Sequence, residues 1–310
     1  MKQSARWVAL AALCVGLAFA GQYVHFLLAT ILIFTLVAMS LTILIGFAGQ
    51  ISIGHAAFWA LGAYTTAILT TKLGAPFFVG VLAGGVIAAL LGVLLALPAL
   101  RVQGHYLAIA TLGFALFVQQ VLYEWESLTG GRHGINVLRP SVFGMDLASD
   151  LAYCYLLLPV VILFGWFTGN LRRSHTGLAL FALKMSAPAA TSAGIDRARH
   201  LVVAFTVSAF FTGISGALYA HLIGYLSTEA FSLEASLGFL TMAVIGGIGS
   251  HVGAVLGAAY LTLAPEVFRE LKNAQLVVYG LTLMLCMRFL PGGLASLPRV
   301  CARLWKAWRT

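Results

Sequence analysis

Long apolar runs joined by short polar connections make up most of the chain. A helix needs roughly 20 mostly apolar residues to cross about 30 Å of hydrocarbon, and many of these runs approach that length. No polar stretch is long enough to fold separately, so we expect residues 1–310 to form one integral membrane domain. The pattern predicts an all-α, polytopic protein of about ten transmembrane helices with glycine-rich helix breaks, at residues 7–24, 27–46, 55–71, 77–99, 105–123, 151–169, 201–223, 236–250, 252–268 and 275–290.

The composition agrees with the apolar pattern. The chain is 61% hydrophobic and 9% charged, with a mean hydropathy of +0.99. A soluble domain usually has about 25% charged residues. A membrane protein is therefore expected on composition as well as on pattern.

The first segment has two interpretations. Residues 1–21 combine a basic start, an apolar middle and a small-residue A-F-A site, which is typical of a cleaved signal peptide. A retained first span, followed by a short turn at Gln22–His25, fits the distribution of charges equally well. Both interpretations stay open on the sequence.

Lys and Arg are unevenly distributed between the connections. With the N-terminus in the cytoplasm, ten spans return the C-terminus to the same side, and the cytoplasmic segments then hold 13 of the 18 basic residues and a single acid, Asp196. The external segments hold five basic residues and the other eight acids. Cytoplasmic loops of membrane proteins carry an excess of Lys and Arg, so both termini are expected in the cytoplasm and residues 124–150 outside. Because the basic residues are dispersed over several loops, they do not predict a nucleic-acid-binding face.

Several chemistries are absent from the sequence. It contains no G-x-x-x-x-G-K-[ST], H-E-x-x-H or C-x-x-C motif, so we predict no ATP-binding P-loop, no catalytic residue, no metal site and no cofactor. The four cysteines are scattered in or near the apolar runs and are interpreted as structural. No span has an Asp, Glu, Lys or Arg at mid-depth, which argues against an ion-coupled carrier. The energy for any transport would then come from another subunit.

A polar, glycine-rich stretch interrupts the apolar pattern at residues 46–64. Gln50, Ser52 and His55 lie where an exposed polar group would be costly in hydrocarbon, so they are expected to face protein or water. Two interpretations stay open: these side chains cap a broken helix, or they line a substrate path. Tyr106 and Thr111 of the fifth span are further candidates for the path.

A second glycine-rich stretch joins the eighth and ninth spans. Gly249, Gly253 and Gly257 repeat every four residues, which predicts a groove along one face of a helix. Small residues let membrane helices approach closely, and such packing drives helix association in lipid. The two glycine-rich stretches have a similar character, which raises the possibility of an internal repeat.

Five stretches follow one another along the chain: 46-GFAGQISIGHAAFWALGAY-64, 101-RVQGHYLAIATLGFA-115, 129-TGGRHGI-135, 228-TEAFSLEASLGFLTMAVIGGIGSHVGAVLGAA-259 and 289-FLPGGL-294. Together they resemble the permease subunits of branched-chain amino acid ABC transporters, of the LivM-like type. The resemblance implies a cell inner membrane protein that pairs with a second related permease. It also implies two ATP-binding subunits and a periplasmic substrate-binding protein, which would supply the missing P-loop.

The resemblance leaves the cargo open. It favours leucine, isoleucine or valine, but related permeases carry urea or short amides. A self-contained, ion-coupled secondary carrier is the alternative from a different class, and a membrane scaffold that no longer transports is a third.

The cytoplasmic segment 170–200 resembles the part of such permeases that contacts the ATPase. The resemblance makes Gly177, Lys184, Ala189, Ala190 and Gly194 candidates for that contact. The segment departs from the family where Ala187 occupies an expected glutamate position, followed by Pro188. Because proline disfavours a helical residue ahead of it, the helix from Leu178 to Met185 is expected to end before Pro188.

The external loop 124–150 is the longest connection expected outside. It mixes acidic and basic residues with glycines that permit tight turns. One interpretation is a solvated loop with no partner. The family resemblance instead favours docking of the binding protein at this face.

Overall fold

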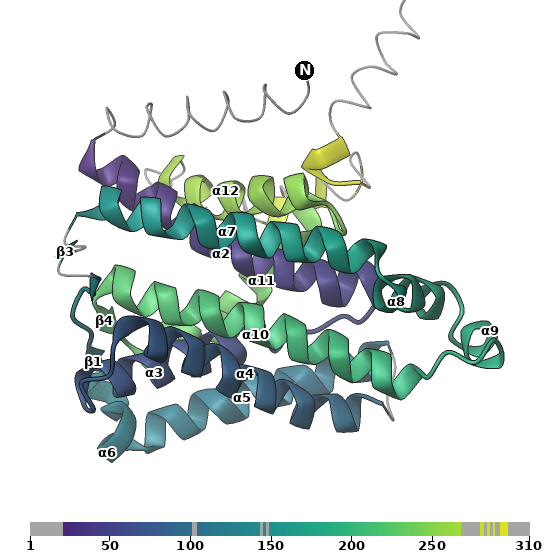
Figure 1. Cartoon of the computed structure of the whole chain (residues 1–310), viewed down its shortest axis with the longest axis horizontal. Helices are drawn as coiled ribbons and strands as arrows, with labels where there is room; N and C mark the ends of the chain where they lie inside the picture. Colours follow the sequence, from purple (N-terminus) through teal and green to yellow (C-terminus); the bar gives the residue numbers. More distant parts are fainter. Residues whose placement is uncertain are drawn as a thin grey trace, which may run out of the picture.

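The computed structural model describes residues 21–100, 104–142, 145–146, 149–267, 280–281, 284–285, 288 and 292–296. Within these ranges the protein is built from helices that run along one long axis (Figure 1). The only strands among the described residues are four of two residues each, so the all-α prediction is confirmed.

Helices occupy eight of the ten predicted ranges. Five of the helical segments described are long and apolar enough to cross a membrane, among them α2 with its continuation η1. The predicted spans 7–24 and 275–290 lie largely outside the described residues, so the count of ten stays a prediction. The eight helical segments are α2 (Gln22–Leu41) with η1 (Thr42–Phe47), α3 (His55–Thr71), α4 (Phe77–Ala99), α5 (His105–Glu124), α7 (Asp150–Arg173), α10 (Arg197–Ile223), α11 (Leu233–Gly246) and α12 (His251–Val267).

The predicted turn at Gln22–His25 is wrong, because α2 already begins at Gln22. The amide of His25 donates to the carbonyl of Gly21, which starts the helix. The His25 carbonyl accepts a hydrogen bond from the thiol of Cys154 at 3.2 Å. This contact joins the start of α2 to α7, and His25 is buried beneath it.

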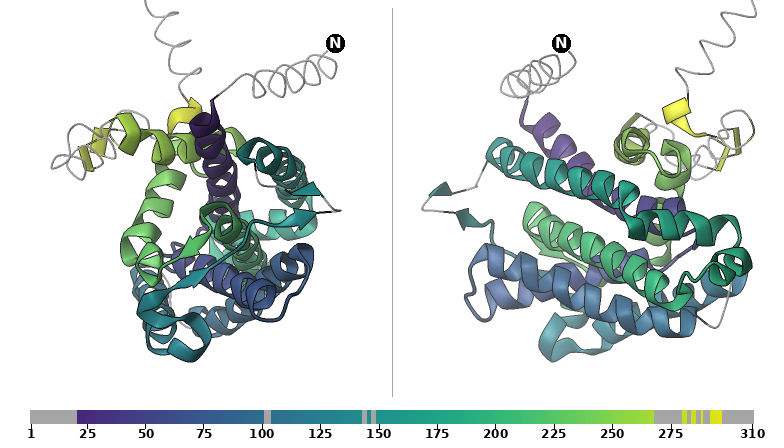
Figure 2. Two further views of the ribbon diagram at one scale, coloured as in Figure 1. Left: turned by 90° about the vertical axis from the view of Figure 1, so that its left-hand side faces the viewer. Right: turned by 45° about the vertical axis from the view of Figure 1, so that its right-hand side comes forward.

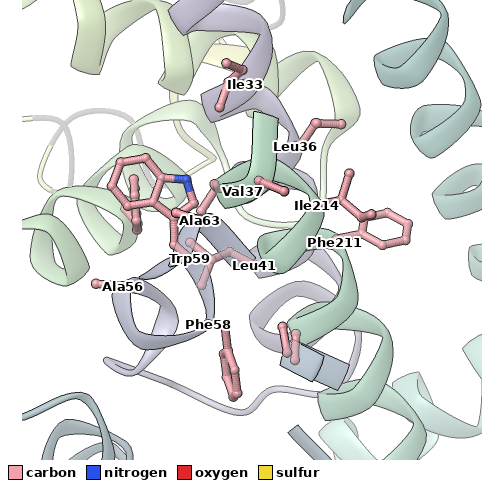
Figure 3. Close-up of a cluster of buried hydrophobic side chains, with 14 of the residues drawn as sticks. Ile33, Leu36, Val37, Leu41, Ala56, Phe58, Trp59, Ala63, Phe211 and Ile214 are labelled. Carbon is pink, nitrogen blue, oxygen red and sulfur yellow. The ribbon is translucent and has the colours of Figure 1, made fainter. Parts of the chain in front are cut away.

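Glycines allow α3, α4 and α10 to approach one another closely. A methyl group on Gly62 of α3 would collide with the backbone of Gly213 in α10, and one on Gly84 of α4 would lie 2.7 Å from the carbonyl oxygen of Gly62. The backbones therefore touch where side chains are missing, which maximises dispersion contacts between helices. Large side chains fill the space around this contact: Figure 3 shows Trp59 of α3 in the same buried cluster as Leu41 of α2 and Ile214 of α10.

The connections gather at two opposite ends of the bundle. At one end lie the short helices α8 (His175–Met185) and α9 (Ala187–Ser192), drawn on the right of Figure 1. At the other end lie α6 (Glu126–Thr129) and the antiparallel pair β1 (Ile135–Asn136) and β4 (Tyr225–Leu226). Segments predicted to be cytoplasmic and external are thus separated.

The loop 124–150, which is predicted to be external, is fixed to the helix ends around it, and the left view of Figure 2 looks onto this end. Lys72, just after α3, donates to the carbonyls of Ser127 and Leu128 at 2.7 and 2.9 Å. Arg139 pairs with the buried Asp150 of α7 at 2.8 Å. The remaining short elements are η2 (Gly131–His133), the antiparallel pair β2 (Ser141–Val142) and β3 (Met145–Asp146), η3 (Thr228–Phe231) and η4 (Leu294–Ser296).

Candidate functional site: the broken helix and the hollow beside it

The polar stretch after η1 forms a break between two helices. η1 is a π-helical turn, and the chain then runs without helix from Ala48 to Gly54 before α3 starts at His55. Gly49 has a φ of 67°, a conformation that glycine adopts without steric strain. Single π-helical turns inside longer helices are often found at functional sites. The sequence therefore predicted this break correctly, at the residues where glycine and polar side chains replace the apolar pattern.

Side chains from other helices satisfy the backbone amides that the break leaves free. Thr111 of α5 accepts a hydrogen bond from the amide of Ile53 at 3.0 Å. Ser236 of α11 accepts one from the amide of Ala56 at 3.2 Å. Within the break itself, the Ser52 hydroxyl accepts from the amide of Gly54 at 3.3 Å. Backbone groups inside a membrane must find partners in the protein, and here three hydroxyls provide them.

His55 belongs to a buried hydrogen-bonded chain that crosses three helices. Its Nε2 lies 3.0 Å from the hydroxyl oxygen of Ser208 in α10. Ser208 in turn donates to the carbonyl of Ser40 in α2 at 3.0 Å, and the hydroxyls of Ser40 and Thr212 lie 2.8 Å apart. All four side chains are buried. We call this set, His55, Ser208, Ser40 and Thr212, the hydroxyl chain.

The apolar pattern of the sequence does not identify the partners of His55 in the hydroxyl chain. Ser208 and Thr212 are spaced by four residues, so they lie on one face of α10, and that spacing inside an apolar run was an available signal. Nothing in the sequence pairs them with His55, which is 153 positions away from Ser208.

Gln50 lies on the other side of the break, beside a hollow of about 310 Å³. This volume is at the lower end of the ~300–1,000 Å³ typical of small-molecule sites. The Gln50 side-chain amide donates to the carbonyl of Ala48 at 3.1 Å. The hollow lies between the break, the α8–α9 connection and the start of α10, and its lining includes Lys184, Ser186, Pro188 and Arg197.

Lys184 of α8 reaches to the end of η1. Its ammonium donates to the carbonyl of Gly46 at 2.7 Å and to that of Ile45 at 3.3 Å. The last carbonyls of a helix have no partner within it, and a cation there also interacts favourably with the helix dipole. Burial lowers the pKa of Lys184 below its ordinary value.

The five candidates for a substrate path do not form one cluster. Ser52, His55 and Thr111 are buried in the joint between helices, where each makes a hydrogen bond within the protein. Gln50 lines the hollow. Tyr106 is 74% exposed on α5. A role in the path stays a prediction for all five. The hydrogen bonds favour capping for Ser52 and Thr111, which accept from backbone amides, whereas His55 bonds to the side chain of Ser208.

The glycines of the second break do not lie on one helix face as predicted. Gly249 precedes α12 and has a φ of 86° in the turn that follows α11. Gly253 and Gly257 are in α12, where added methyl groups would meet the backbone of Gly246 and of Met242. The prediction of a groove formed by three glycines is therefore wrong for Gly249, because α12 begins two residues after it.

The two breaks touch each other. A methyl group on Gly46 would lie 2.9 Å from the Cα of Gly249, so the end of η1 packs directly against the turn between α11 and α12. Both regions have the order helix, break, helix. An internal repeat stays a hypothesis, since only their contact is shown.

The segment 170–200, which is predicted to be cytoplasmic, contains two short helices after the end of α7. α8 ends at Met185, which confirms the predicted end before Pro188. Ser186 then caps α9 by accepting from the amide of Ala189 at 3.4 Å, and Pro188 sits in the first turn of α9, a position that proline tolerates. The remaining ATPase-contact candidates lie along this segment: Gly177 near the start of α8, Ala190 buried in α9, and Gly194 after it with a φ of 86°.

Known proteins resemble this chain over most of its length. The family described as branched-chain amino acid transport system / permease component matches residues 23–287. The high-affinity branched-chain amino acid transport system permease protein LivM of Escherichia coli is 32% identical, over 86% of this chain and 69% of that protein. LivM of Salmonella typhimurium is 31% identical with the same coverage, and LivH of Escherichia coli is 24% identical over 86% of this chain and 92% of its own. No solved structure matches the chain.

Proposed function

The chain belongs to the branched-chain amino acid transport permease family, and we propose that it is the membrane permease subunit of an ATP-driven importer for these amino acids. The observation that carries this proposal is the extent of the family match. It runs from residue 23 to residue 287 and so includes both breaks, the hollow and the cytoplasmic segment. A chain that shared only apolar helices with the family would not be expected to match across these polar connections.

The chain is proposed to work with a second, related permease. Two permeases of Escherichia coli, LivM and LivH, are named for a high-affinity branched-chain amino acid transport system, and both match this chain. A substrate path between two such subunits would need residues on the outer surface of each. Tyr106 is available for that purpose because it is exposed on α5.

ATP-binding subunits are proposed to supply the energy, because the chain has no P-loop of its own. Their docking surface would be the α8–α9 segment, which projects from one end of the bundle (Figure 1). The exposed side chains there include Met185, which is 86% exposed. With Ala187 in place of the expected glutamate, this contact would depend on apolar packing and on cations such as Arg199.

A periplasmic binding protein is proposed to deliver the substrate at the opposite end. The external loop 124–150 is held by hydrogen bonds to α3 and by an ion pair to α7, so it offers a pre-organised surface, and pre-organisation lowers the cost of binding. Leu138 is 82% exposed on this loop. The proposed location is the cell inner membrane, with both termini in the cytoplasm.

The proposal is tested by reconstituting the permease pair, the ATPases and the binding protein in vesicles. Uptake of leucine, isoleucine or valine is expected to require both ATP and the binding protein. The permease alone, given an ion gradient, is expected to accumulate nothing. Accumulation by the isolated chain would identify a secondary carrier, and ATP-driven uptake of urea or short amides in preference to leucine would reassign the cargo.

A further inference from the structure

Lys184 makes a contact that docking of an ATPase would not require. Its ammonium bonds to the carbonyls of Ile45 and Gly46, although the residue as a whole is exposed and lines the hollow. Hydrogen bonds that involve a charged group are about twice as strong as neutral ones. The two bonds therefore tie the last residue but one of α8 to the end of the first described membrane helix.

Two further contacts bring α8 against the same break. The aliphatic part of Lys184 lies over Gly49, where an added methyl group would come within 2.8 Å of the lysine Cγ. The rings of Phe47 and Phe181 pack with their centroids 5.0 Å apart. α8 and the end of η1 thus share a polar contact and an apolar one, and a side chain at Gly49 would separate them.

The break that Lys184 contacts is connected to α3 and to the turn before α12. Beyond Gly54 the chain becomes α3, which packs against α10. On its other side the end of η1 touches Gly249, in the turn that leads into α12. Packed helices and rigid breaks transmit small displacements when they move as units. A displacement of α8 would therefore reach α3 and α12 through the same joint.

We propose that Lys184 is a positioning residue that couples the α8–α9 segment to the break at residues 45–50, so that both move together. This inference rests on the proposed function, because the movement is supplied by ATPases docked on α8–α9. It assigns to Lys184 a role inside the permease. The plainer interpretation is that Lys184 only caps the end of η1, in which case its loss would lower stability and leave coupling intact.

The ratio of substrate transported to ATP hydrolysed separates these interpretations. In the reconstituted complex, Lys184→Met keeps the length of the side chain and removes the ammonium. We expect the ratio of substrate transported to ATP hydrolysed to fall by at least about fivefold, because the variant loses two charge-assisted hydrogen bonds. Lys184→Arg, which can still donate to both carbonyls, is expected to restore most of it.

Thr206→Val is the control. The Thr206 hydroxyl also donates to a backbone carbonyl, that of Val202 at 2.7 Å, but within its own helix α10, so its loss is expected to leave the ratio unchanged. An unchanged ratio in Lys184→Met, or an equal fall in both variants, overturns the proposal. If the wild-type complex itself shows no ATP-dependent uptake, the proposed function fails instead.

A tether tests the same idea where Lys184→Met does not assemble. Two cysteines replace Phe47 and Phe181 in a chain whose four native cysteines have been replaced. They are joined by a short bis-methanethiosulfonate reagent, which forms a disulfide with each thiol, releases methanesulfinate and is cleaved by reduction. If α8 and the break move together, the tethered complex should transport at the rate of the same complex after cleavage of the reagent. Loss of transport on tethering, recovered on cleavage, would show that the two must separate and would overturn the proposal.

Discussion

At the residue scale, hydrogen bonds distinguish the polar side chains of the first break. His55 is 1% exposed and bonds to Ser208, whereas Gln50 bonds only locally, to Ala48, and lines the hollow. A buried hydroxyl left without a partner costs about 1–3 kcal/mol. The hydroxyl chain is therefore expected to stabilise the fold, and Gln50 is the better candidate for contact with substrate.

His55→Leu is accordingly expected to lower the free energy of unfolding by about 0.5–1.5 kcal/mol, because Ser208 loses its bond to the imidazole while keeping its bond to the Ser40 carbonyl. His55→Gln can still bond to Ser208 and should keep folding and most transport. Gln50→Leu should leave stability unchanged and lower transport sharply, since Gln50 lines the hollow. Thermal unfolding and ATP-dependent uptake per folded complex measure the two effects. Wild-type uptake by Gln50→Leu would leave the whole break as a structural joint.

At the scale of elements, close backbone approach holds the second break together. Gly253 in α12 faces the carbonyls of Gly246 and Gly247, and an added methyl group would lie 2.7 and 2.6 Å from their oxygens. Rigid backbone cannot give way as a flexible side chain can. The short helix α11 is therefore held against α12 by the absence of a side chain.

Gly253→Leu is expected to destabilise the isolated chain by about 3 kcal/mol or more, at the upper end of overpacking effects. Gly113→Leu on α5 is the control, because an added methyl group there meets no other atom within 4 Å. The yield and thermal stability of each variant in detergent give the comparison. Equal behaviour of the two variants would contradict the packing role of Gly253.

At the scale of the whole molecule, different connecting segments lie at the two ends of the helix bundle. The α8–α9 segment lies at one end, while α6 and the β1–β4 pair lie at the other (Figure 1). Contacts between distant residues agree with this separation: Lys184 meets Gly46 at one end, and Lys72 meets Leu128 at the other. The distribution of Lys and Arg predicts which end is cytoplasmic.

Tags that report location test this orientation in cells. A tag after Thr310 and one within residues 174–200 are expected in the cytoplasm, and one within residues 128–145 outside. The reason is the excess of basic residues in the connections assigned to the inside. An exchanged location for any of the three tags would refute the ten-span topology.

The sequence by itself determined the main helices, the membrane class and the position of the first break. These properties depend on local composition, because a bilayer selects apolar runs of sufficient length and requires every backbone group within it to be satisfied. The first break was visible for the same reason, since glycine and polar side chains stand there in an apolar context. Family membership was also within reach, because its motifs are short and occur in order.

Only the tertiary structure decided what the polar residues and glycines contact. His55 meets Ser208, and the amide of Ala56 meets Ser236, across 153 and 180 positions of sequence. Gly249 adopts a positive φ in a turn where a four-residue spacing had suggested a helix, and Lys184 bonds to the end of η1. Hydrogen bonds and backbone approach between helices depend on how the helices pack, and the pattern of apolar residues along the chain does not specify that packing.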